Sequence, residues 1–280
     1  MIRRAAVSFP VFGVAAIALT GIISAGCAMT PYGAPVAATV ADEAVEAGYL
    51  SAARLEALAA AVPAPSAEGS AEQIADRALS DRYRGLEDTD RWLLATAHAE
   101  LSPSLARQHF DCALGVRFPG TPTPRLTILF EKVLHDAETV AETVKARTAR
   151  PRPVAVDPAR RACARLTDAS RASPSYPSGS AAVGAAYGEA LARVDPEHAA
   201  AAREIGHQIA LSRVVCGMHY PADAAAGEAV GRAVVADIAA TPAFQAELAI
   251  ARQELAEVRA TGLTNPGCAA ERAALAMTLP

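Results

Sequence analysis

The sequence has no excess of basic residues, no closely spaced pair of cysteines and no alternating polar and apolar runs. Its 26 lysines and arginines stand against 30 acidic residues, a net charge of −4. Nucleic acid is therefore not expected as a main partner, because no surplus charge neutralises a phosphate backbone. The lack of a CxxC pair argues against a zinc site, and the lack of period-two alternation argues against β-strands.

Long apolar runs are also missing after residue 28, so no later segment is expected to cross a membrane. Residues 1–28 differ: Arg3 and Arg4 precede an apolar run that ends in small residues before Cys27. This pattern predicts a signal peptide and export to the periplasm. The segment 24–27 resembles a lipobox, although Ser24 replaces the usual branched apolar residue. A lipid anchor at Cys27 and a retained membrane anchor both stay open.

Few cysteines remain if Cys27 is removed or lipidated. They are Cys112, Cys163, Cys216 and Cys268. An even number in an oxidising compartment allows two disulfides in three possible pairings, and the sequence does not choose among them.

Helical signals dominate the rest of the chain. Residues 29–40 are rich in proline, glycine and alanine and predict a tether, and residues 41–280 predict a single all-α domain. An alanine-rich pattern runs to about Ala61, a break follows at 63–69, and Ser70 with Gln73 has the spacing of a capping box. The segment 241–260 separates apolar from charged residues with helical spacing. Five pairs of a capping residue and proline predict helix starts: Ser102-Pro103, Thr123-Pro124, Asp157-Pro158, Asp195-Pro196 and Thr241-Pro242.

Three clusters of polar residues could carry chemistry. "KARTARPRP" contains Lys145 and Arg152, "PSGS" covers residues 177–180, and "SRVVCGMHYPAD" contains Arg213, His219 and Asp223. Each has an ordinary structural interpretation: a cationic helix end, a loop entering a helix, and a histidine near a helix start.

Together the clusters predict a phosphoryl-transfer site. A transferring phosphoryl group spreads negative charge over its oxygens and needs fixed cations and N–H donors. Lys145, Arg152 and Arg213 supply charge, and a helix start at 178–180 supplies backbone donors. His219 is a competent nucleophile if Asp223 holds its second ring nitrogen.

The order and spacing of these motifs resemble the type 2 phosphatidic acid phosphatase superfamily, and specifically its bacterial class A non-specific acid phosphatases. The resemblance extends from about residue 48 to 260 through "GSAEQIADRALSDRYRGLEDTDRW", "FDCALG" and "TPAFQAELAIARQELA". It implies a helical bundle, a phosphohistidine formed on His219 and oriented by Asp223, and no metal or other cofactor. It also implies phosphate contacts from Lys145, Arg152, Ser178, Gly179 and Arg213.

Two positions depart from the family pattern. Val154 stands where phenylalanine usually follows the Arg-Pro pair. Ser180 stands where the family has a histidine that protonates the leaving group, and a hydroxyl does not transfer that proton near neutral pH. We expect the remaining histidines to be structural or on the surface; they are His98, His109, His135, His198 and His207. A di-metal site at Glu204 and His207 is not expected, because a second Glu-x-x-His pair is missing.

These observations predict an exported, metal-independent acid phosphatase acting on small phosphorylated substrates, with weakened protonation of the leaving group at Ser180. Inorganic phosphate is the expected second ligand. Two alternatives stay open: a catalytically impaired relative that binds phosphate, and a vanadate-dependent haloperoxidase.

Overall fold

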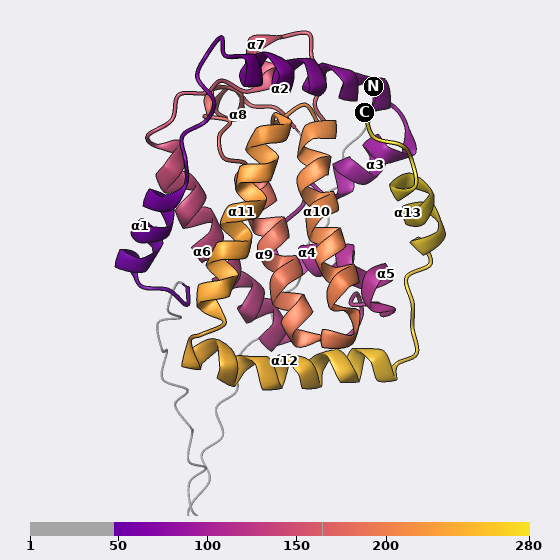
Figure 1. Cartoon of the computed structure of the whole chain (residues 1–280). Coiled ribbons are helices and arrows are strands. Elements are labelled where there is room, and N and C mark those ends of the chain that lie inside the picture. Colours follow the sequence, from indigo (N-terminus) through magenta and orange to yellow (C-terminus); the bar gives the residue numbers. More distant parts are fainter. Residues whose placement is uncertain (1–47, 164) are drawn as a thin grey trace, which may run out of the picture. The chain divides into compact units, whose positions relative to one another are not determined.

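The computed structural model describes residues 48–163 and 165–280, and every regular element within them is a helix (Figure 1). The predicted all-α class is thus confirmed. The predicted signal peptide (1–28), the tether (29–40) and Cys27 lie outside the described residues, as does the beginning of the predicted domain.

The described chain forms thirteen α-helices and three short 3-10 helices. The α-helices are α1 (Ala52–Ala61), α2 (Ala71–Arg82), α3 (Asp90–Ala97), α4 (Pro103–Ala106), α5 (Asp111–Leu114), α6 (Pro124–Lys145), α7 (Pro153–Val156), α8 (Asp168–Ala172), α9 (Gly179–Val194), α10 (Ala199–Val215), α11 (Pro221–Ile238), α12 (Pro242–Ala260) and α13 (Cys268–Leu275). The 3-10 helices are η1 (Tyr83–Leu86), η2 (Arg107–Phe110) and η3 (Pro196–His198).

Most of the predicted helix starts are present, although their capping differs. Ser70 accepts the N–H of Gln73 at 3.2 Å, while the Gln73 side chain accepts the N–H of Gly69 and not that of Ser70. Thr241 caps α12 through the N–H of Phe244 at 3.3 Å.

The other four proline pairs behave in three ways. Ser102 and Thr123 precede helices without a side-chain capping bond, and Asp195 opens only a 3-10 turn. The prediction for Asp157-Pro158 is wrong, because Asp157 ends α7 and its carboxylate accepts the N–H of Ala159 at 2.9 Å. An aspartate two residues before a free N–H forms a turn as readily as it caps a helix.

Helix α9 is buried over most of its length and packs against α6, α10, α11 and α12 (Figure 1). Its contact with α11 depends on two glycines. A Cβ atom on Gly227 would lie 2.3 Å from the carbonyl oxygen of Ser178, and one on Gly231 would lie 2.2 Å from that of Ala182. Only glycine permits this approach, so backbone contact fixes the start of α9 against the first half of α11.

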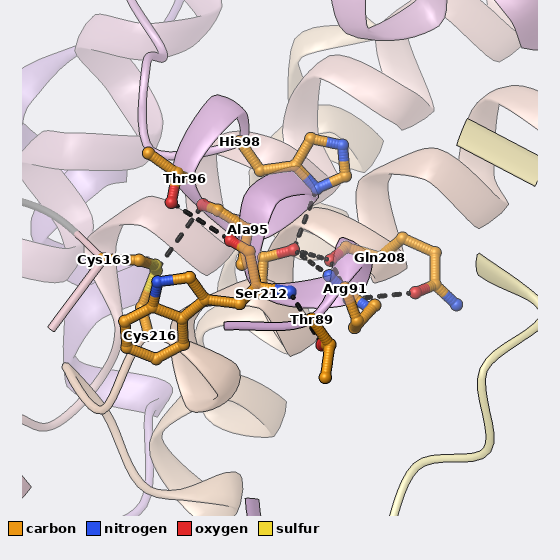
Figure 2. The surroundings of a disulfide bond; sticks show 10 residues. Thr89, Arg91, Ala95, Thr96, His98, Cys163, Gln208, Ser212 and Cys216 are labelled. Atoms are coloured by element: carbon orange, nitrogen blue, oxygen red, sulfur yellow. Dashed lines mark hydrogen bonds between the residues drawn. A yellow bond between two sulfur atoms is a disulfide. The ribbon is translucent and has the colours of Figure 1, made fainter. Parts of the chain in front are cut away.

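Two disulfides join distant segments of the described chain. Cys112 pairs with Cys268, and Cys163 pairs with Cys216 at the end of α10 (Figure 2). The sequence left three pairings open, and the structure shows this one.

Candidate active site

Helix ends bring the predicted site residues together at one end of the helical bundle. Helices α9 and α11 begin at this end, whereas α6 and α10 finish there (Figure 1). The residues are Lys145 at the end of α6, Arg152 just before α7, residues 178–180 at the start of α9, Arg213 in the last turn of α10, His219 just before α11 and Asp223 in its first turn.

His219 is buried, and both of its ring nitrogens have partners. Nδ1 donates to the carbonyl oxygen of Ser175 at 2.8 Å, and Nε2 accepts from Nη1 of Arg152 at 2.8 Å. A guanidinium can only donate, so this pairing assigns the proton to Nδ1 and leaves a lone pair on Nε2. Burial, followed by the charges of Arg152, Arg213 and Lys145, lowers the pKa of His219 well below its ordinary value of 6.5. The imidazole is therefore neutral, with its lone pair facing the cations.

Asp223 reaches His219 only indirectly. Its Oδ2 lies 3.9 Å from Nδ1 of His219, too far for a hydrogen bond. Ser175 stands between them: its hydroxyl donates to Oδ2 of Asp223 at 2.5 Å, and its carbonyl accepts from His219. The sequence predicted a direct carboxylate–imidazole pair, whereas the structure places one residue between its members.

The other side of Asp223 is fixed by Arg150 and helix α2. Arg150 donates to Oδ1 of Asp223 at 2.8 Å, pairs with Asp76 of α2, and lies 4.4 Å from the ring centroid of Tyr220. Asp76 also accepts the N–H of Ala222 at 2.9 Å. Burial raises the pKa of Asp223, while Arg150 opposes that effect. Both carboxylate oxygens are occupied by protein donors, so Asp223 is poorly placed to bind a metal ion.

Arg152 and Arg213 are buried cations that, within the described chain, form no ion pair with a carboxylate. Burial lowers the pKa of both guanidinium groups. The pKa of Arg213 falls to about 10, because the nearby positive charge of Arg152 lowers it further. Nε and Nη1 of Arg213 are buried without an acceptor among the described residues. A buried guanidinium with unused donors is costly, and a bound anion removes that cost.

The first turn of α9 offers further donors. Ser178 caps the helix through the N–H of Ala181, and its own N–H donates to the carbonyl of Asp223 at 2.9 Å. The N–H groups of Gly179 and Ser180 have no acceptor in the described part of the chain. Nζ of Lys145 lies 3.3 Å from where a Cβ on Gly179 would be. Glycine thus lets the ammonium approach a helix start that already favours anions.

The two departures from the family pattern occupy different surroundings. Ser180 is partly exposed, at the second position of α9. Val154 is fully buried, in an apolar cluster with Ala181 and Val214. Val154 therefore belongs to the wall behind the site, and Ser180 to its open side.

The other histidines have partners away from these residues. His98 contacts Ser212, His109 contacts the carbonyl of Glu100, and the other three pair with carboxylates: His135 with Asp136, His198 with Asp195, and His207 with Glu228.

One group of side chains in the described residues has the spacing of metal ligands. It consists of Asp195, Glu197 and His198, at the opposite end of α9 from His219. Asp195 is already paired with Arg259 at 2.6 Å and His198 at 2.9 Å. The group is separate from the candidate active site.

Sequence reasoning missed three residues that hold the site together: Ser175, Arg150 and Asp76. Arg150 lies inside the motif "KARTARPRP", and Ser175 lies two residues before the motif that starts at Pro177. A polar residue next to a predicted site motif was the signal that could have identified both. Asp76 gave none, because its contact with the N–H of Ala222 spans 146 residues of sequence.

The comparisons with known proteins agree with this geometry. Residues 127–245 match the sequence model of the PAP2 superfamily, the superfamily that the sequence motifs resemble. The matched segment contains every predicted site residue.

The relatives are named phosphatases. The chain is 29% identical over 201 residues to a non-specific acid phosphatase of Providencia stuartii, covering 71% of this chain and 81% of the relative. It is 29% identical over 204 residues to an acid phosphatase of Zymomonas mobilis (71% and 76%), and 28% identical over 194 residues to a non-specific acid phosphatase of Salmonella typhimurium (69% and 77%). These similarities bear out the predicted enzyme class, a phosphatase.

A solved structure is also similar: a transmembrane PAP2-type phosphatidylglycerolphosphate phosphatase from Bacillus subtilis, with a TM-score of 0.44 and 20% identity, covering 67% of this chain and 91% of that one. Among the described residues of the present chain, no single helix has the length and apolar character to cross a membrane. Helices α11 and α12 meet those criteria only as a pair, bent by 97°.

Proposed function

We propose that this protein is an exported acid phosphatase that hydrolyses phosphate monoesters through a phosphohistidine on His219, without a metal ion. The observation that carries the proposal is the neutral His219, whose Nε2 lone pair faces Arg152; within the described residues neither Arg152 nor Arg213 beside it has a carboxylate partner. Export is supported by the positively charged, apolar N-terminal sequence and by two disulfides, which persist in oxidising compartments.

The phosphoryl group has matching partners on each side. Arg152, Arg213 and Lys145 neutralise its charge, and the N–H groups of Gly179 and Ser180 donate to its oxygens. When phosphate engages the Arg152 guanidinium, Nε2 of His219 is released from that contact and can attack phosphorus. The carbonyl of Ser175 holds the Nδ1 proton, and the nearby carboxylate of Asp223 stabilises the positive charge that develops on the ring.

Phosphorylated His219 is then attacked by water, and inorganic phosphate is released. Three fixed cations supply the charge that a metal would otherwise provide, which supports the metal-independent mechanism. The hydroxyl of Ser180 is too weak an acid to act as the general acid for an alkyl leaving group near neutral pH. We therefore expect aryl phosphates and other esters with stable leaving anions to be preferred substrates.

The deciding experiment measures turnover of aryl and alkyl phosphates in the presence of EDTA. We expect activity in chelator, competitive inhibition by vanadate, and an acid-labile, base-stable phosphate on His219 after quenching. Loss of activity in EDTA that a divalent ion restores would contradict the metal-free mechanism.

The serine at position 180, where the family has a histidine, favours a second candidate function, a phosphate-binding protein with impaired catalysis. Binding of phosphate with no product in a single-turnover experiment would support it. Peroxide-dependent halide oxidation after loading with vanadate would instead indicate a haloperoxidase.

A further inference from the structure

Cleavage of an alkyl phosphate requires a proton for the departing oxygen, and the phosphate-binding residues and the nucleophile do not supply it. Lys145, Arg152 and Arg213 are needed as cations, and His219 is the proposed nucleophile. The other five histidines are bound elsewhere, and Asp223 is enclosed by protein donors. A donor must be a weak acid that touches the phosphate site from its open side.

Glu142 meets these requirements. It lies one turn before Lys145 on α6, and its Oε1 is 2.6 Å from Nζ of Lys145. The same oxygen lies 3.7 Å from where a Cβ on Gly179 would be, so the carboxylate reaches the first turn of α9. Its side chain is 65% exposed, whereas that of Lys145 is 9% exposed. Glu142 thus occupies the solvent side of the ammonium, where a leaving group can depart.

The nucleophile and this carboxylate contact different cations. Nε2 of His219 contacts Arg152, whereas Oε1 of Glu142 contacts Lys145. A phosphoryl group held by both cations would contact the attacking nitrogen at one partner and the carboxyl group at the other. In-line displacement places the nucleophile and the leaving group on opposite sides of phosphorus, an arrangement that these two contacts permit.

We infer that Glu142 is the general acid that protonates the leaving oxygen, an inference that rests on the proposed phosphatase function. In the first step the Nε2–phosphorus bond forms, the bond from phosphorus to the leaving oxygen breaks, and the carboxyl proton of Glu142 passes to that oxygen to give the alcohol. In the second step the Glu142 carboxylate accepts a proton from water, whose oxygen attacks phosphorus. The nitrogen–phosphorus bond breaks, and phosphate, neutral His219 and protonated Glu142 are restored.

Charge around Glu142 explains how it gains its proton. The charged groups that act with it are Lys145 and Glu138 on α6 and Arg152 before α7. In the free protein, Oε1 of Glu142 forms an ion pair with Nζ of Lys145. A bound phosphate dianion engages the same ammonium and adds negative charge beside the carboxylate, and like charges in one site favour protonation of one partner. Acidic solution also favours the protonated form of the carboxyl group.

The test compares Glu142→Gln with Glu138→Gln, which removes the same charge one turn farther from Lys145. We expect Glu142→Gln to lower kcat/KM for alkyl phosphates ~10²-fold but to change it for aryl phosphates less than about threefold, because only a poor leaving group needs the proton. The alkaline decline of kcat/KM for alkyl phosphates should disappear in this variant. Glu138→Gln should keep the substrate selectivity of the parent and retain an alkaline decline, shifted only slightly to lower pH because a neighbouring negative charge is lost.

A double variant separates catalysis from folding. If Glu142 supplies the proton, adding Ser180→His should raise alkyl turnover by a larger factor in Glu142→Gln than in the parent, because only the Glu142→Gln background lacks an acid. Equal losses on both substrate types, or the same change in Glu138→Gln, would overturn the inference and leave Glu142 as an electrostatic neighbour of Lys145. A parent protein that cleaves no phosphate ester would instead refute the proposed function.

Discussion

Arg213 and Arg91 are both buried, and the pKa of each falls to about 10 because burial disfavours the charge, yet the two guanidinium groups have opposite surroundings. Nη1 of Arg91 donates to Ser212 at 2.9 Å, and Nη2 donates to the carbonyl and side-chain oxygens of Gln208 at 3.2 and 3.1 Å (Figure 2). His98 completes the network by contacting Ser212 at 2.9 Å. No such acceptor meets Arg213 in the described chain.

Consecutive residues of α10 separate the two regions. Ser212 faces the Arg91 network, whereas Arg213, about 100° further around the helix, faces His219. The terminal nitrogens of Arg91 donate to protein oxygens, although its Nε has no acceptor among the described residues. Within the same residues, two donor nitrogens of Arg213 stay unpaired. A buried cation satisfied by the fold serves stability, and one left unsatisfied is prepared for an anion.

The largest expected effect comes from His219→Ala. It removes the proposed nucleophile from the region of Arg213 and leaves the Arg91 network untouched. We expect turnover to vanish and phosphate binding to persist, because the cations bind the anion without the imidazole. Calorimetric titration with phosphate and a turnover assay check this. Substantial turnover by the variant would disprove a covalent route through His219.

The next effect contrasts Arg213→Ala with Arg91→Ala. We expect Arg213→Ala to lower kcat/KM ~10²–10³-fold, as loss of a charge-stabilising donor does. Arg91→Ala should instead lower the free energy of unfolding by about 2–4 kcal/mol, because it leaves a cavity and unpaired oxygens.

Urea denaturation and kinetics on both variants separate these outcomes. Phosphate should raise the Tm of Arg91→Ala and have little effect on that of Arg213→Ala. If both variants lose stability and activity together, the proposed contrast between a structural and a ligand-binding arginine does not hold.

A smaller and more selective effect is expected from Ser180→His. A positioned acid typically contributes ~10²–10⁴ in rate, and it helps an alkoxide far more than a nitrophenolate. The variant should therefore gain activity on alkyl phosphates and change little on aryl ones. The helix start opposes a charged imidazole there, which limits the gain. Equal changes in kcat/KM on both substrate types would show that position 180 does not serve the leaving group.

The smallest effect concerns pH. Because the pKa of His219 is lowered well below 6.5, Nε2 stays unprotonated in mildly acidic solution. The value of kcat/KM should therefore decline only when the pH falls below this lowered pKa. Removing a cation should raise this pKa, so Arg213→Ala should move the acidic limit to higher pH while Arg91→Ala should not. NMR titration of the His219 ring measures the shift directly. An unchanged titration in Arg213→Ala would contradict the electrostatic explanation.

The sequence predicted the helical class and the residues that gather at the site, because helix caps and spaced motifs act over a few residues. It also anticipated that Ser70 and Thr241 begin helices. It was wrong about Asp157, since a carboxylate before proline also forms a turn. Its predicted roles for His219 and Asp223 stay predictions, although their proximity is now visible.

The contacts that connect the site could not be predicted, because they join residues far apart in the chain. Ser175 lies 48 residues from Asp223, and Arg150 lies 73 from it. The pairing of Cys163 with Cys216 was equally undetermined. Glu142 was missed for another reason. A glutamate three residues before a lysine is a common surface pair on a helix, and only the position of Gly179 shows what lies beside it.

The glycine contacts between α9 and α11 constrain how this protein can evolve. Because backbone meets backbone at Gly227 and Gly231, a larger residue at either position would move the start of α9 relative to His219 and Asp223. The nucleophile and the anion-binding turn would be displaced relative to each other, so the cleavage of every substrate would be affected at once. Mutations that adapt the protein to a new phosphate ester while preserving its chemistry should therefore accumulate in the segments around this helix pair that carry no site residue, such as residues 146–149.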